Sequence, residues 1–135
     1  KMKIKIIPLI LICISCANPR SCPDLNYNSI NKITETANGK LYTGRCTTYE
    51  NESKRSIQQY LNGKDYGKWM FYFPNGKIET KGRFNEEGQR IGKWKYYHEN
   101  GELRQISRYS KRGERLGKWV KFDSEGVKVE EINYE

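Results

Sequence analysis

The sequence predicts an all-β protein, an elongated single-layer antiparallel meander of about four β-hairpin repeats. The first observation is a repeated Gly-Lys-Trp, which begins at Gly67, Gly92 and Gly117 and therefore recurs every 25 residues. The second is a tight-turn signal after each of the first two copies, at Asn75-Gly76 and Asn100-Gly101. A fixed period of this size indicates one supersecondary unit copied along the chain, and Asn-Gly between aromatic and β-branched runs indicates a hairpin.

Within each repeat, an aromatic residue follows the Trp by three positions, at Tyr72, Tyr97 and Phe122. The favoured two-residue hairpin turn needs positive φ at both central residues, so we expect this conformation at both Asn and Gly of the Asn-Gly turns. The recurring Gly and Trp positions are predicted to be structural, and they are Gly67, Trp69, Gly92, Trp94, Gly117 and Trp119.

An earlier copy of the unit precedes the three clear ones. The segment Gly63–Gly67 matches the turn between later repeats, and Gly39–Gly44 matches it with one insertion. In this copy Gly44-Arg45-Cys46 stands where Gly-Lys-Trp stands later, so Cys46 takes the place of a Trp. The repeat domain is therefore predicted over residues 39–135.

The pattern Gly-Lys-Trp…Tyr…Asn-Gly…Gly-x-x-x-Gly resembles the bacterial variant of the MORN repeat, found in the YwqK-type antitoxin family. The resemblance covers the predicted repeat domain. It implies an elongated sheet of consecutive hairpins, and it implies no single activity.

The first residues have the pattern of a bacterial export signal. Residues 1–15 combine a basic start with the apolar run Ile4–Ile14, which is too short to span a bilayer comfortably. The segment ends Ser15-Cys16, which resembles a lipoprotein signal in which Cys16 becomes the lipidated N-terminus, for example with palmitate. The alternative is an ordinary secretory leader that is cleaved nearby. We therefore predict a lipoprotein in the bacterial envelope, with Asn18 favouring the outer membrane.

Residues 16–38 are predicted to be a tether and an N-terminal cap for the repeat array. The spacing of apolar residues between Leu25 and Thr36 fits either a short helical turn or a strand. We expect the segment Ile33–Ala37 to be the first strand and to protect the open edge of the sheet.

Two cysteines lie outside the leader, Cys22 and Cys46. In an oxidising compartment a disulfide is the more common use of such a pair, and a metal site would need three or four ligands in a chain with a single His. The predicted bridge would hold the N-terminal segment over the end of the sheet and stabilise the fold by about 3 kcal/mol.

A binding surface is predicted from the positions that vary between repeats and from a column of positive charge. The apolar run Met70–Phe73 either contacts a partner or packs on the next hairpin. The Lys of each Gly-Lys-Trp and its counterpart Arg45 share one repeat position. The candidate surface comprises Met70, Phe71, Tyr72, Phe73, Lys68, Lys93 and Lys118.

Charge narrows the class of partner for this column. The formal net charge is +9, and it falls to +6 when the three leader lysines at positions 1, 3 and 5 are subtracted. The column suits anionic lipid, polysaccharide or an acidic protein, or it is a solvated row that prevents edge pairing. Nucleic acid fits less well because glutamates are expected to interrupt the basic surface, namely Glu79, Glu86, Glu87, Glu99, Glu102 and Glu114.

Catalysis has little support in the sequence. His98 is the only His, and it shares its repeat position with Phe73 and Asp123. Neither a nucleophile with its base nor a phosphate-binding Gly loop is evident, so no enzyme activity, metal or cofactor is predicted. We expect a lipid-anchored envelope protein whose repeat sheet is a protein-binding or scaffold module. The alternative is an antitoxin or immunity protein that binds a toxin directly.

Overall fold

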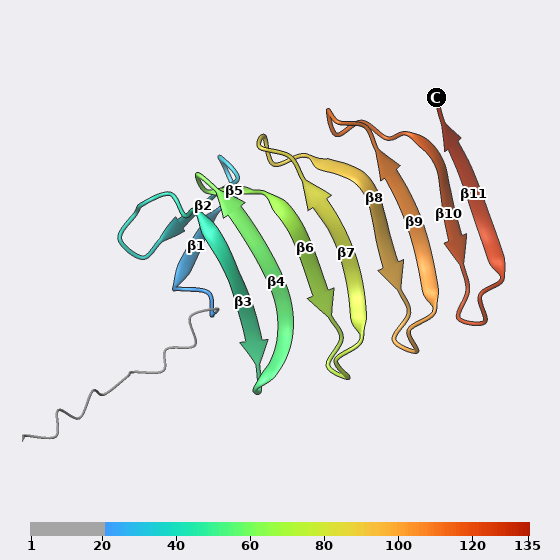
Figure 1. Cartoon of the computed structure of the whole chain (residues 1–135), viewed down its shortest axis with the longest axis horizontal. Coiled ribbons are helices and arrows are strands. Elements are labelled where there is room, and N and C mark those ends of the chain that lie inside the picture. The colour runs from blue at the N-terminus through green and yellow to red at the C-terminus, as the bar shows by residue number, and fades with distance from the viewer. Residues whose placement is uncertain (1–20) are drawn as a thin grey trace, which may run out of the picture.

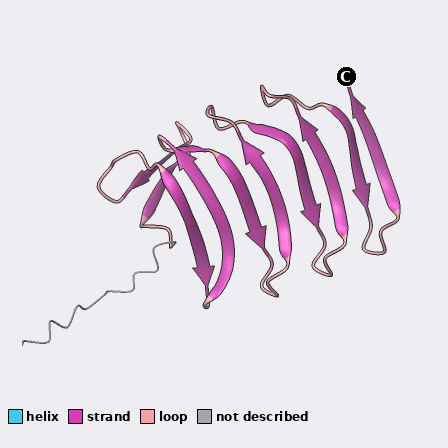
Figure 2. Cartoon of the chain, viewed as in Figure 1, coloured by secondary structure: helices cyan, strands magenta, loops and turns pink. Residues whose placement is uncertain are grey.

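A computed structural model describes residues 21–135, which form an extended antiparallel sheet one layer thick (Figure 1). The strands are joined only by turns and loops in this part of the chain (Figure 2), and it holds no helix long and apolar enough to cross a membrane. The predicted all-β fold class is confirmed. The main sheet contains β3 (Gly44–Glu50), β4 (Ser53–Leu61), β5 (Lys64–Asp65), β6 (Gly67–Tyr72), β7 (Ile78–Phe84), β8 (Arg90–Tyr97), β9 (Leu103–Tyr109), β10 (Gly117–Phe122) and β11 (Lys128–Tyr134).

Four hairpins follow one another along the sheet, in the order β3-β4, β6-β7, β8-β9 and β10-β11. The three later hairpins repeat one register, because the first Gly of each pairs with an aromatic residue that closes the hairpin. These pairs are Gly67 with Phe84, Gly92 with Tyr109 and Gly117 with Tyr134. The 25-residue period of the sequence therefore corresponds to one hairpin per repeat.

The Asn-Gly turns differ from the sequence prediction. Gly76 has a φ of 81°, but the φ of Asn75 is not positive. The amide of Phe73 donates to the carbonyl of Lys77, which leaves a three-residue loop rather than a two-residue one. Such a loop needs positive φ only at its last position, so the prediction for Asn75 and Asn100 was wrong.

Turns with two successive positive-φ residues occur instead at the tip of the first hairpin and between β4 and β5. Asn51 and Glu52 have φ values of 47° and 63° at the tip of the first hairpin. Asn62 and Gly63 have φ values of 50° and 77° between β4 and β5. A two-residue loop requires this backbone, and Asn tolerates it better than most residues do.

The N-terminal cap is a small separate hairpin. Strands β1 (Leu25–Asn28) and β2 (Ile33–Thr36) pair with each other, so the choice between helix and strand is resolved as strand. The expected strand at residue 33 is present, but β1 precedes it. The amide of Thr34 donates to the carbonyl of Gly63 at 2.7 Å, which attaches this hairpin to the repeat sheet.

A disulfide joins Cys22 to Cys46 across a sequence separation of 24 residues, as predicted. Cys46 is 1% exposed and lies in β3 at the position that Trp occupies in later repeats. Beside the disulfide, the amide of Cys22 donates to the carbonyl of Thr47 at 3.0 Å. The N-terminal segment thus covers the first strand of the sheet, which would otherwise expose unpaired backbone groups.

The core is an aromatic ladder on one face of the sheet. Ring centroids lie 5.3 Å apart between Tyr60 and Trp69, 5.1 Å between Trp69 and Phe84, and 5.0 Å between Phe84 and Trp94. The rings meet edge to face, which is the arrangement that aromatic quadrupoles favour. Because the sheet has no second layer, neighbouring hairpins supply most of the burial for each other.

Each repeat Trp is also hydrogen-bonded to the preceding hairpin. The indole Nε1 of Trp69 donates to the carbonyl of Gln59 at 2.8 Å, that of Trp94 to Arg83 at 3.2 Å, and that of Trp119 to Arg108 at 3.0 Å. The structure thereby explains why Trp recurs at this position: its ring fills the ladder and its N–H ties two hairpins together.

Gly82 makes room for this arrangement. It lies in β7, and the ring of Trp94 from the next hairpin covers it so closely that an added Cβ would be 2.1 Å from the ring. Its backbone is extended, so the need for Gly at this position is steric.

We predict that Gly82→Ala lowers the free energy of unfolding by about 1–3 kcal/mol, because the methyl group displaces the Trp94 ring. Urea denaturation followed by tryptophan fluorescence measures the loss. As a control, Gly82→Ala is placed in a Trp94→Leu background, where the smaller side chain should reduce the cost. An equal cost in both backgrounds would contradict the proposed clash.

Candidate functional site

The face opposite the aromatic ladder is strongly basic. Strand alternation and the cross-strand register place basic side chains from β3 to β9 on this side. We call this surface the basic face, and its residues are Arg45, Lys54, Lys68, Lys81, Arg83, Lys93, Lys95 and Arg108.

The register shows how one row of this face crosses the sheet. Met70 in β6 pairs with Lys81 in β7, and Lys81 pairs with Lys95 in β8. Lys95 in turn pairs with Ile106 in β9. The neighbouring row, which contains Trp69 opposite Gly82, belongs to the aromatic ladder. The basic and aromatic surfaces are therefore the two sides of the same strands.

The central feature of the basic face is a set of like-charge pairs. Lys68 lies opposite Arg83, Lys81 opposite Lys95, and Lys93 opposite Arg108. Like charges directly opposite each other destabilise a sheet. These pairs are therefore a cost to the fold that packing on this face does not explain.

Carboxylates do not neutralise these pairs. Among residues 21–135, ion pairs join Arg55 to Glu50 and, at the far end of the sheet, Lys118 to Glu131, Lys121 to Glu130 and Lys128 to Glu131. None of these involves the six residues of the like-charge pairs. Lys81 is instead directed over the ring of Tyr97, at 5.4 Å from its centroid.

A shallow hollow of about 420 Å³ lies among these lysines. Trp69, Met70 and Gly82 are the uncharged residues of its lining. Its basic lining consists of Lys68, Lys81, Arg83, Lys93 and Lys95. The hollow offers a small apolar contact surrounded by positive charge.

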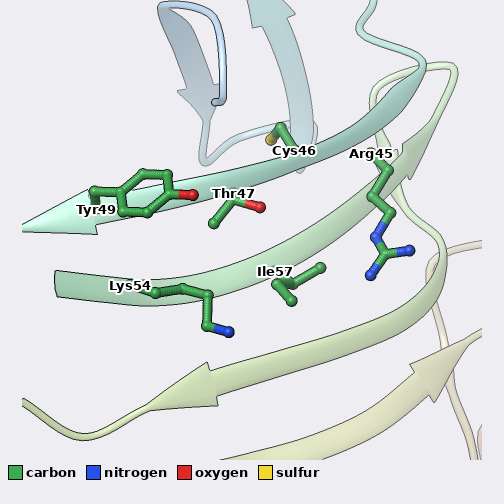
Figure 3. A pocket seen from close by; sticks show the side chains of 6 residues that line it. All are labelled: Arg45, Cys46, Thr47, Tyr49, Lys54 and Ile57. Atoms are coloured by element: carbon green, nitrogen blue, oxygen red, sulfur yellow. The ribbon is translucent and has the colours of Figure 1, made fainter. Parts of the chain in front are cut away.

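A second hollow, of about 430 Å³, lies on the same face over the first hairpin (Figure 3). Figure 3 shows Arg45 and Lys54 at its margins and Thr47 and Ile57 between them. The ammonium of Lys54 is 4.2 Å from the ring centroid of Tyr72 in β6. The basic face thus continues from the central hairpins to the N-terminal end of the sheet.

Five of the six glutamates that were expected to interrupt a basic surface lie in the connections between strands, and Glu79 alone lies within a strand of the basic face. Glu86 and Glu87 are in the turn after β7, Glu99 and Glu102 are at the turn before β9, and Glu114 is at the turn after β9. Glu79 lies in β7 opposite a register shift between Phe71 and Tyr72. The expected interruption was wrong for the turn residues, because hairpin connections carry their side chains to the ends of the sheet.

The predicted column of Arg45, Lys68, Lys93 and Lys118 lies on this face, but its last member differs from the others. The Nζ of Lys118 is 2.9 Å from a carboxylate oxygen of Glu131. Hydrogen bonding to Glu131 raises the pKa of Lys118, and hydrogen bonds from Lys118 and Lys128 lower the pKa of Glu131. The C-terminal end of the column is therefore neutralised within the protein.

The predicted apolar run Met70–Phe73 does not form one exposed patch. Met70 and Tyr72 lie on the basic face, and Tyr72 is only 8% exposed. Phe71 lies on the other face, where its ring is 5.9 Å from that of Trp69. Phe73 begins the turn after β6 and is half-buried. Of this run, Met70 alone lines the central hollow.

The sequence interpretation missed five residues of the basic face: Lys54, Lys81, Arg83, Lys95 and Arg108. A signal was present, because Lys81 and Arg83 are two positions apart, as are Lys93 and Lys95. Residues at this spacing share one face of a strand. The repeat signal itself marks only the Gly-Lys-Trp position, at which none of these residues lies.

The aromatic face also carries charged side chains, and two of them lie over the rings of the ladder. The guanidinium of Arg90 lies 4.6 Å from the centroid of the Trp94 ring, and that of Arg115 lies 5.1 Å from that of Trp119. The pKa of Tyr60 is raised to about 12, mainly by burial and to a smaller extent by the nearby charge of Asp65. Arg90 and Arg115 are exposed and lie over the ladder, whereas Tyr60 belongs to the core.

His98 has a structural contact. One of its ring nitrogens, Nε2, is 3.0 Å from the carbonyl oxygen of Phe122, which links the β8-β9 hairpin to β10. Within residues 21–135, no group of His, Cys, Asp and Glu side chains could hold a metal ion.

Two segments of the chain match a known family. Residues 65–86, which contain β6 and β7, and residues 90–111, which contain β8 and β9, each match the MORN repeat variant. MORN repeats are generally protein-binding or membrane-binding modules, and this all-β fold is typically non-catalytic. No curated protein and no solved structure matches the chain.

We predict that Lys95→Met raises the free energy of unfolding by about 0.2–1 kcal/mol at low salt, because it removes the like charge opposite Lys81 and keeps an unbranched side chain. Chemical denaturation measures the change, which should shrink as salt screens the pair. Lys111→Met, in an exposed turn, is the matched control and should have little effect. A loss of stability in Lys95→Met at low salt would show that the pair is not repulsive.

Proposed function

We propose that this chain is a non-catalytic binding module of the bacterial envelope, anchored by a lipid on Cys16, whose basic face holds a partner protein. The observation that carries the binding proposal is the set of opposed basic residues on β6 to β9, which form no ion pair with a carboxylate of residues 21–135. A sheet that retains such repulsion gains from a ligand that neutralises it.

The shape of the molecule supports binding by a surface. The four hairpins form a single layer, so the two faces of the sheet are broad (Figure 1). Repeat arrays generally recognise partners through extended surfaces of this kind. Two adjacent hairpins also match a repeat family whose members are generally binding modules.

The N-terminal sequence and the cysteines support an envelope location. The predicted signal peptide and Cys16 lie outside the described residues, and the pattern Ser15-Cys16 after an apolar run supports lipidation. The disulfide between Cys22 and Cys46 is consistent with an oxidising compartment. We place the protein in the outer membrane, facing the periplasm or the cell surface.

We predict that the chain incorporates labelled palmitate and fractionates with membranes, and that Cys16→Ala abolishes both. Cys13→Ala is the matched control, because it removes a neighbouring cysteine of the same segment and should leave labelling unchanged. A soluble, unlabelled product would contradict the envelope assignment. It would favour the alternative function, a cytoplasmic antitoxin that binds its toxin directly.

We also predict that a photo-crosslinking amino acid at Arg83, an exposed position of the basic face, captures a discrete protein in intact cells. The same amino acid at Val129, an exposed position in the last strand away from the paired basic residues, is the control. An adduct that forms equally at both positions, or at neither, would contradict partner binding by the basic face.

A further inference from the structure

We infer that the basic face binds an acidic polypeptide segment in which an apolar side chain lies between carboxylates. This inference rests on the proposed binding function and names the chemistry of the partner. The site is the part of the basic face that surrounds the Met70 hollow, formed by Lys68, Met70, Lys81, Arg83, Lys93 and Lys95.

Charge is the first reason. The pairs Lys68 with Arg83 and Lys81 with Lys95 bring four cations together on adjacent strands, and no ion pair among residues 21–135 includes them. Lys68 and Arg83 are exposed, and Lys81 and Lys95 are half-buried. A ligand with several carboxylates would remove the repulsion that the free protein carries.

The apolar floor of the hollow is the second reason. Met70 lies opposite Lys81 and within the ring of lysines, where its side chain is half-buried. A small apolar contact enclosed by polar groups is the usual arrangement of a protein-binding hot spot, and Met adapts readily to the shape of its partner. A polysaccharide or a phosphodiester backbone has no apolar side chain to place there.

The spacing of the charges is the third reason. Lys81 and Arg83 are two residues apart on β7, and Lys93 and Lys95 are two residues apart on β8. Such residues are separated by about 6.6–6.8 Å along a strand. An extended peptide that lies along the strands presents alternate side chains at the same spacing, so carboxylates on every second residue match these cations.

Single-stranded nucleic acid is less favoured by the same surface. Its binding sites combine positive charge with exposed aromatic rings on which bases stack. On the central strands of this face Tyr72 is buried beneath the ammonium of Lys54, and Tyr97 is half-buried beneath that of Lys81. These rings are already covered by cations from the protein itself.

The test uses the full chain purified from membranes in a nonionic detergent, with a fluorescent synthetic peptide as the probe. The first peptide is Glu-Ser-Glu-Ser-Leu-Ser-Glu-Ser-Glu, which places Leu between carboxylates on one side of an extended chain. A second peptide replaces Leu by Ser, and a third replaces every Glu by Gln. Fluorescence anisotropy gives each dissociation constant at several salt concentrations.

We expect the first peptide to bind about tenfold more tightly than the Ser peptide, because only Leu can bury apolar surface against Met70. The Gln peptide should not bind, and binding of the first peptide should weaken with salt. Lys81→Glu should reduce its affinity by at least about tenfold. This variant should remain folded, because the new carboxylate lies opposite Lys95.

Lys64→Glu is the matched control, since it makes the same charge change at an exposed residue that does not line the Met70 hollow. Equal losses in Lys64→Glu and Lys81→Glu, or equal binding of the Leu and Ser peptides, would overturn the inference. Tighter binding of a single-stranded oligonucleotide or of anionic phospholipid vesicles than of the first peptide would overturn it too.

The outcomes also separate this inference from the proposed function. A protein adduct at Arg83 without binding of the acidic peptide would refute the acidic partner and leave partner binding intact. Binding of the peptide without an adduct in cells would support the surface chemistry and count against the proposed function.

Discussion

The hydrogen bond from each repeat Trp to the preceding hairpin is the interaction on which this sheet depends. Trp69, Trp94 and Trp119 each donate an indole N–H to a carbonyl on the last strand of the hairpin before. A single-layer sheet has no opposing layer to bury its side chains, so burial must come from neighbours within the sheet. The Trp ring and its N–H provide both the packing and the alignment of one hairpin on the next.

The concentration of packing on one face leaves the other face free to carry charge. The aromatic ladder contains the most buried rings, with Trp94 2% exposed. On the opposite side, the lysines at positions 81 and 95 face each other. Repulsion between such pairs costs less than about 1 kcal/mol each, whereas burial of one aromatic side chain contributes more. The fold tolerates the basic face because the ladder holds the strands in place.

The strand at the N-terminal end of the sheet is covered by other parts of the chain, and the strand at the C-terminal end is more exposed. At the N-terminal end, Cys22 covers strand β3 through the disulfide and a backbone hydrogen bond to Thr47, and the hairpin of β1 and β2 is bonded to Gly63 in the turn after β4. At the other end, β11 pairs on one side with β10, and Val129 on it is 61% exposed. The first repeat has Cys46 where later repeats have Trp. This replacement makes the cap possible, because a Trp at this position would bind an earlier hairpin, whereas Cys46 bonds to Cys22.

The 25-residue period alone determined the hairpins, the Trp positions and the Cys46 exchange, because local patterns specify turns and strand alternation. Only the tertiary structure decided which side chains oppose each other across hairpins. Lys81 and Lys95 belong to different repeats, and their pairing lies beside a register shift between β7 and β8, at residues 81 to 83. A shift of one residue moves a side chain to the other face, and no local pattern in one strand sets its register against the next hairpin.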